Sequence, residues 1–119
     1  MTVQNISAVT LAVKGMAKAV DFYQAKVGLV LRYGGPTASF TSFEVGQSYL
    51  NLILATEGEW SWWGRLILHV DDVNAIYDRL TSAGLSPDAP PEDASWGERY
   101  FHISDPDGHE LSFAKGLED

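Results

Sequence analysis

The stretch Trp96-Gly-Glu-Arg-Tyr-Phe-His-Ile-Ser-Asp-Pro-Asp-Gly-His109 decides the fold of this chain. Within it, Phe101 and Ile103 alternate with polar residues, and a period of two predicts a strand. The four residues Asp105-Pro-Asp-Gly108 are of the types that form tight turns. An apolar segment that ends at Lys115 predicts another strand after the turn. The stretch therefore predicts two strands joined by a turn.

The residues that precede this stretch predict one more strand and a helix. Residues 64–70 form a short, mainly apolar segment that is typical of a strand. Asp71 or Asp72 is a suitable N-cap for a helix that runs to about Ala83. Residues 87–92 are rich in proline and acidic side chains, which predicts a loop.

The first half of the chain has the same order of elements. Residues 6–13 alternate as a strand does, and residues 16–27 place apolar side chains at helical spacing. Three further segments, residues 29–33, 39–45 and 49–55, are separated by glycine-containing turns and predict three strands.

The two halves form an internal repeat. Ala8 and Arg65 occupy equivalent positions in the first strand of each half, 57 residues apart (65 − 8). A repeated half-sheet unit implies two modules, each of which buries an apolar face. We predict one domain, residues 1–119, of class α+β. It consists of two βαβββ modules, about 5–55 and 64–115, that form a cupped mixed sheet with the helices on its outer face.

Composition excludes several classes of protein. The chain has 119 residues, no cysteine and a formal net charge of −8. Disulfides, thiolate catalysis and cysteine-bound zinc are therefore excluded. The negative charge disfavours nucleic acid as a partner. No apolar run approaches the ~18 residues of a membrane span, and the N-terminus lacks a signal pattern, so we expect a cytoplasmic protein.

The sequence resembles the vicinal oxygen chelate superfamily, which comprises glyoxalases, bleomycin-resistance proteins and dioxygenases. The resemblance extends over nearly the whole chain and implies the two-module fold described above. It does not by itself imply an activity, because one fold supports many functions. The stretches that carry it are Val9–Val13, Asp21–Leu29, His69–Val73 and Trp96–His109.

In this superfamily, function centres on a metal ion held by His, Gln or Glu side chains. The resemblance places these ligand positions at Ala8, Asn51, Arg65 and Ser112. Ala8 has no donor atom, and Arg65 is a permanent cation without a lone pair to give. A guanidinium at the position of a ligand also repels a metal cation. We therefore expect no metal and no other cofactor.

Three other polar residues are candidates for a site in the cup. By alternation, His69, His102 and Glu110 face the same side of the sheet and could form a displaced metal or acid–base site. The alternative is that they line a pocket with satisfied hydrogen bonds. His109 follows the turn and is expected to be exposed.

The connector Glu57-Gly-Glu-Trp-Ser-Trp-Trp63 contains three of the four tryptophans beside two acidic residues. Tryptophan faces flanked by carboxylates suit a flat or aromatic cation. The alternative is that these tryptophans seal a junction between modules or a dimer interface. Two roles are also open for Arg65, which could bind a carboxylate or phosphate of a ligand or pair with Glu110.

Three functional hypotheses follow. The first is a metal-independent protein that binds a small molecule, as in drug sequestration and antibiotic resistance, and acts as a homodimer. The second is a lyase, isomerase or dioxygenase-like enzyme that uses His69, His102 or Glu110. The third is a structural dimer without a ligand. For the first hypothesis, the predicted ligand-binding residues are Trp60, Trp62, Trp63, Arg65, His69, Trp96, Tyr100 and His102.

Overall fold

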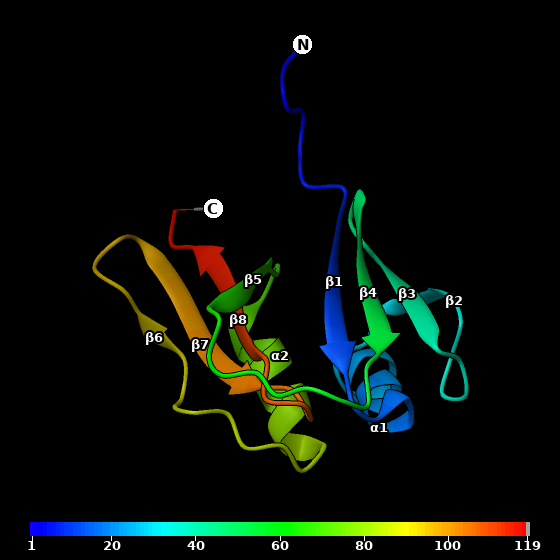
Figure 1. Ribbon diagram of the computed structural model, residues 1–119. Coiled ribbons are helices and arrows are strands. Elements are labelled where there is room, and N and C mark those ends of the chain that lie inside the picture. Colours follow the sequence, from blue (N-terminus) through cyan, green and yellow to red (C-terminus); the bar gives the residue numbers. More distant parts are fainter. Residues whose placement is uncertain (119) are drawn as a thin grey trace. The chain divides into compact units, whose positions relative to one another are not determined.

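The computed structural model describes residues 1–118, which form two compact units. The first unit is Met1–Glu59, and the second begins at Trp60. Each unit contains one four-stranded mixed sheet (Figure 1). The fold is thus α+β with a repeated unit, as the sequence predicts.

In the first unit, the strands are hydrogen-bonded in the order β1-β4-β3-β2. Strand β1 is parallel to β4, and the other neighbouring strands are antiparallel. The elements of this unit are β1 (Ala8–Val13), α1 (Met16–Val20), a π-helix η1 (Asp21–Lys26), β2 (Val30–Tyr33), β3 (Phe40–Val45) and β4 (Ser48–Leu54).

The second unit repeats this topology with the strand order β5-β8-β7-β6. Strand β5 is parallel to β8, and the remaining pairs are antiparallel. Its elements are β5 (Arg65–His69), α2 (Val73–Ser82), β6 (Glu92–Asp93), β7 (Glu98–Ser104) and β8 (Glu110–Gly116).

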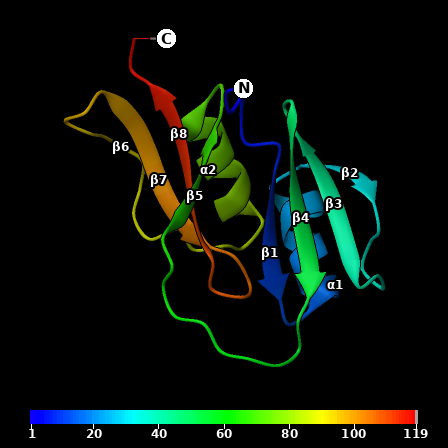
Figure 2. The ribbon, with the colours of Figure 1, turned by 45° about the horizontal axis from the view of Figure 1, so that its top comes forward.

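The helix of the second unit packs on one face of its sheet (Figure 2). Phe101 and Ile103 of β7 are buried on this face, and the ring of Tyr77 of α2 contacts the ring of Phe101 at 5.3 Å. The predicted cap of α2 is also confirmed, because Asp72 accepts a hydrogen bond from the backbone N–H of Ala75 at 3.0 Å. The opposite side of this sheet is called the helix-free face below.

The register of the strands confirms the internal repeat. In the first unit, Ala8 lies opposite Tyr49. In the second unit, Arg65 lies opposite Glu110. The offsets between equivalent residues are 57 (65 − 8) and 61 (110 − 49). Because register sets which side chains share a face, equivalent residues of the two units lie on equivalent faces.

Two sequence predictions need correction. The helix predicted over residues 16–27 is α-helical only to Val20 and then continues as a π-helix, in which the N–H of Val27 donates to the carbonyl of Phe22, five residues back. The segment predicted as a loop over residues 87–92 ends in strand β6, where Glu92 pairs with Tyr100. Periodicity missed this two-residue strand because so few residues show no pattern.

No helix within residues 1–118 is long and apolar enough to cross a membrane.

Candidate functional site

The helix-free face of the second sheet carries polar side chains in rows that run across the strands. Arg65 of β5 lies opposite Glu110 of β8. In the next row, Ser112 of β8 lies opposite His102 of β7. Consecutive rows on one face are about 7 Å apart, since each residue of a strand advances about 3.4 Å. The register therefore brings Arg65, Glu110 and His102 within reach of one another.

The centre of this face is an ion pair between Arg65 and Glu110. The Nε of Arg65 donates to Oε2 of Glu110 at 3.0 Å. The Nε1 of Trp62 donates to the same oxygen at 2.8 Å, and the Arg65 guanidinium lies 5.9 Å from the centre of the Trp62 ring. One of the two roles open to Arg65, pairing with Glu110, is therefore present in the structure.

These contacts lower the pKa of Glu110. The hydrogen bond from Trp62 is the largest cause, and Arg65 adds a hydrogen bond and a favourable charge. The charge of His102 also favours the ionised carboxylate. Each of these groups stabilises the anion, so Glu110 stays ionised to a lower pH than an ordinary glutamate.

This pKa shift predicts a pH-dependent stability. Because the folded pKa is the lower one, the contribution of Glu110 is present above the ordinary glutamate pKa and is lost as the pH falls through the folded pKa. The free energy of unfolding of the wild type should exceed that of Glu110→Gln by more at pH 6 than at pH 3. Denaturant unfolding at both pH values measures the difference, with exposed Glu44→Gln as the control. A difference that is the same at both pH values would contradict the prediction.

A row of aromatic rings extends from β7 beside this ion pair. The ring centres of Trp96 and Tyr100 are 5.5 Å apart, and those of Tyr100 and His102 are 5.0 Å apart. Trp96 and Tyr100 each donate a hydrogen bond to a carboxylate. Trp96 Nε1 donates to Oε1 of Glu98 at 2.9 Å, and the Tyr100 hydroxyl donates to Oε1 of Glu92 at 2.6 Å. The hydrogen bond to Glu92 is the main reason that the pKa of Tyr100 is raised.

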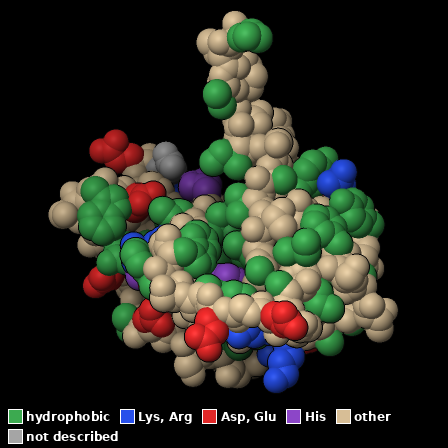
Figure 3. Space-filling model, in the orientation of Figure 1, with side chains coloured by type: hydrophobic (Ala, Val, Ile, Leu, Met, Phe, Trp, Pro, Cys, Tyr) green, Lys and Arg blue, Asp and Glu red, His purple; other side chains and the backbone are tan. Residues whose placement is uncertain are grey.

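The aromatic row is accessible and lies beside negative charge. The side chain of Trp96 is 67% exposed. Hydrophobic side chains and carboxylates lie next to one another on the part of the second unit that carries β6 and β7 (Figure 3). A hollow of about 430 Å³ adjoins Trp96 and is also lined by Gly97, Gly116, Leu117 and Glu118.

His102 contains an unsatisfied polar atom. Its Nδ1 is buried and has no hydrogen-bond partner among the described residues. A buried polar atom without a partner costs about 1–3 kcal/mol, so this nitrogen requires a partner that the described residues do not supply. His102 therefore ends the aromatic row with a buried, unpartnered Nδ1.

The residues at the metal-ligand positions do not fit a metal ion. Arg65 is engaged with Glu110, and the amide Nδ2 of Asn51 donates to Oγ1 of Thr10 at 3.3 Å. Ala8 has no donor, which leaves two neutral oxygens, the unpartnered Oδ1 of Asn51 and the hydroxyl of Ser112, and no charged ligand at these positions. Within residues 1–118, no group of three or more His, Cys, Asp or Glu side chains has the geometry of a metal site.

The three candidate catalytic residues are not brought together as one cluster. His102 is close enough to Glu110 for its charge to act on the carboxylate. His69 is exposed on the edge strand β5, opposite Ala114, and lies two rows from Arg65. The structure thus separates His69 from Glu110 along the strand direction.

The remaining tryptophans of the connector lie against His109. Trp63 Nε1 donates to His109 Nδ1 at 2.8 Å, and the Trp60 ring stacks on the imidazole at 5.6 Å. The expectation that His109 is exposed is wrong, because only 4% of it is accessible. The connector covers it, and a position next to a turn gives no sign of a contact with residues 46 positions away.

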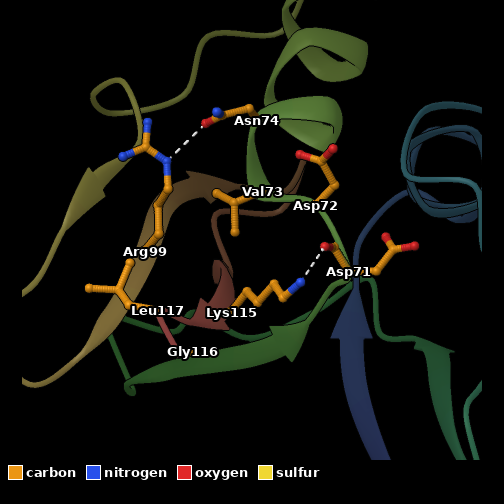
Figure 4. Close-up of a pocket in the computed structure, with 8 residues that line it drawn as sticks. All are labelled: Asp71, Asp72, Val73, Asn74, Arg99, Lys115, Gly116 and Leu117. Carbon is orange, nitrogen blue, oxygen red and sulfur yellow. Dashed lines mark hydrogen bonds between the residues drawn. The ribbon is translucent and has the colours of Figure 1, made fainter. Parts of the chain in front are cut away.

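A second hollow, of about 360 Å³, lies beside the start of α2, on the helix side of the sheet (Figure 4). Arg99 Nε donates to Oδ1 of Asn74 at 2.9 Å, and Lys115 Nζ donates to the carbonyl of Asp71 at 3.0 Å. Arg99 also pairs with Asp93 at 3.0 Å. The chain itself thus provides partners for both cations of this hollow.

Two four-stranded mixed sheets of the same topology, each with its own helix, define a glyoxalase-like protein. The family model of the Glyoxalase/Bleomycin resistance protein/Dioxygenase superfamily matches residues 5–113, and the chain belongs to this superfamily.

Individual relatives cover almost the whole chain. The protein YraH of Bacillus subtilis (strain 168) is 26% identical in an alignment 123 positions long, and the match covers 92% of this chain and 96% of YraH. The crystal structure of TioX from Micromonospora sp. ML1 is 25% identical with a TM-score of 0.78, and the match covers 96% of this chain and 100% of TioX. Lactoylglutathione lyase from Agrobacterium tumefaciens shares the fold, with a TM-score of 0.82, 17% identity and coverage of 99% and 98%.

Sequence reasoning missed three residues of this region. Glu98 and Glu92, which bind the polar edges of Trp96 and Tyr100, were not candidates. Glu98 could have been found, because it lies two residues before Tyr100 in one strand and so faces the same side. Glu92 and His109 required knowledge of strand pairing and of the path of the connector.

Proposed function

We propose that this protein binds a small organic ligand without a metal ion, on the helix-free face of the second unit. The observation that carries the proposal is the contact of Arg65 with Trp62 and Glu110. The family resemblance places a metal-binding side chain at the position of Arg65. A cation is supplied there by the protein itself. Metal chemistry is not needed for binding, which requires only affinity.

The charge on this face favours a cationic ligand. One guanidinium, that of Arg65, stands against the carboxylates of Glu92, Glu98 and Glu110. Carboxylates that accept hydrogen bonds from Trp96 and Tyr100 also polarise these rings and increase the negative charge on their faces. An aromatic face attracts a cation by about 0.5–2 kcal/mol, and more when water is excluded.

The unpartnered Nδ1 of His102 adds a directional requirement. It is an acceptor when deprotonated, so a ligand N–H or O–H that lies over the aromatic row would satisfy it. The ligand class that matches these features is a flat organic cation with a hydrogen-bond donor. Sequestration of such a compound, including a drug, is the activity that binding alone supports.

Fluorescence titration tests the proposal. An acridinium dye should quench tryptophan emission and bind more tightly than an uncharged three-ring analogue, and excess chelator should leave its affinity unchanged. Trp96→Leu and Glu98→Gln should each weaken binding about tenfold, which corresponds to about 1.4 kcal/mol. Asp93→Asn is the matched control, because Asp93 lies on the neighbouring strand but pairs with Arg99 instead. Equal binding of the uncharged analogue, or loss of binding with chelator, would refute the proposal.

A further inference from the structure

A buried histidine holds the segment that carries Trp62. The four residues Trp60–Trp63, called the tryptophan strap here, run past His109 just before strand β5 begins. Trp60 stacks on the imidazole with an interplanar angle of 10°, and Trp63 meets it edge-on at 5.8 Å. Trp60 Nε1 also donates to the carbonyl of Asp107 at 3.2 Å, so two tryptophans fasten the strap to the loop between β7 and β8.

The hydrogen bond from Trp63 defines the protonation state of His109. An indole N–H can only donate, so the Nδ1 of His109, 2.8 Å away, must present a lone pair. An imidazolium carries hydrogens on both nitrogens and has no acceptor. Protonation at Nδ1 would place two N–H groups face to face and remove the bond.

The strap also carries one residue of the candidate site. Trp62 lies between the two fastened tryptophans and donates to Glu110, the carboxylate that pairs with Arg65. Trp62 is otherwise 68% exposed, so little packing of its own fixes its position. Its placement therefore depends on the contacts that Trp60 and Trp63 make with His109.

We propose that His109 is the residue that positions Trp62 on the helix-free face, and that protonation of His109 releases the tryptophan strap. While His109 is neutral the strap is closed, and Trp62 completes the contact with Arg65 and Glu110. When His109 is protonated the bond from Trp63 is lost, and Trp62 leaves Glu110. The effect on ligand affinity rests on the proposed function, whereas the movement of the strap does not.

Three acidic residues lie in or next to this loop. Asp105 Oδ1 accepts the backbone N–H groups of Asp107 and His109, both at 2.9 Å. The backbone carbonyl of Asp107 accepts the hydrogen bond from Trp60, and Glu110 follows His109 in the chain. Any of them can shift the pH at which the strap opens. A variant that changes only the imidazole is therefore needed to assign the transition.

NMR spectra of the indole N–H groups test the proposal without a ligand. The chain has four tryptophans, and each indole N–H donates a hydrogen bond, which gives four resonances to follow from pH 8 to pH 5. The resonances of Trp60, Trp62 and Trp63 should shift together with one midpoint, because the three indoles belong to one strap and their contacts are lost together. Trp96, bound to Glu98, should not follow them and serves as an internal control. Tryptophan-to-phenylalanine variants assign the peaks.

Two variants separate positioning from mere packing. In His109→Asn, the side-chain oxygen stands near the place of Nδ1 and still accepts the indole N–H, but it does not titrate. Its three strap resonances should stay near their neutral positions down to pH 5. His109→Phe keeps an aromatic ring for Trp60 but removes the acceptor, so it should show the released positions of Trp62 and Trp63 even at pH 8.

The outcomes distinguish this inference from the proposed function. A wild-type Trp63 resonance that does not move between pH 8 and pH 5, or an identical transition in His109→Asn, would overturn the role of His109. With the acridinium dye, the wild type should bind more weakly at pH 5 than at pH 8, whereas His109→Asn should bind equally at both. If no dye binds at any pH but the strap titrates, the proposed function fails and the inference stands.

Discussion

Replacing Phe101 with alanine should destabilise the second unit by about 3–5 kcal/mol, the usual cost of removing a buried aromatic ring. Phe101 is only 2% exposed and stacks on Phe113 at 5.3 Å, while Tyr77 of α2 meets it edge-on at the same distance. Alanine leaves a cavity between α2 and the sheet that neither ring can fill without leaving its rotamer. Urea unfolding measures the loss as a lower midpoint.

The neighbouring residue provides the control. Tyr100 precedes Phe101 in β7 but points to the helix-free face, where it is half-buried. Tyr100→Ala should therefore cost clearly less, about 1 kcal/mol, while it disrupts the aromatic row and weakens binding of the acridinium dye. Equal destabilisation by the two variants would contradict the assignment of opposite faces.

Gly34→Ala should destabilise the first unit by at least about 3 kcal/mol. Gly34 has φ +91°, a left-handed conformation that an L side chain adopts at a cost of about 1–2 kcal/mol. In addition, a Cβ there would lie 2.4 Å from the carbonyl oxygen of Phe40 and 2.7 Å from Cα of Thr41. Both atoms belong to the backbone of strand β3, so no side-chain rotation relieves the overlap. Thermal unfolding should show a strongly lowered midpoint temperature for this variant.

Gly84→Ala separates strain from overlap. Gly84 has nearly the same φ, +88°, but no heavy atom of the described residues lies within 4 Å of the Cβ position. This variant should lose only about 1–2 kcal/mol of stability, the cost of a left-handed backbone conformation for an L residue. If the two alanine variants were equally destabilised, the close approach at Gly34 would have no energetic effect.

Much of the fold was predictable because it depends on short-range patterns. Alternation in residues 98–104 and the offset between Ala8 and Arg65 predicted strands and their repeat, and the strand register agrees. Asp72 was a predictable cap because capping involves residues three positions apart. The alternation of β8 also placed Glu110 and Ser112 on one face.

The candidate site was less predictable because its contacts join distant parts of the chain. Arg65 and Glu110 are separated by 45 residues, and only the parallel pairing of β5 with β8 shows that they meet. The sequence left two partners open for Arg65. It also gave no reason to place Glu92, in a two-residue strand, against Tyr100.

The sequence and the tertiary structure each determined a different part of what is known about the candidate site. The sequence by itself determined the two-unit α+β fold, because periodicity is a property of the chain, and the family resemblance placed Ala8 and Arg65 at metal-ligand positions. Only the tertiary structure decided that Glu110 pairs with Arg65, that Trp62 joins them, and that His109 is buried under the connector. These contacts depend on strand register and on the path of a loop, and neither leaves a local pattern in the sequence.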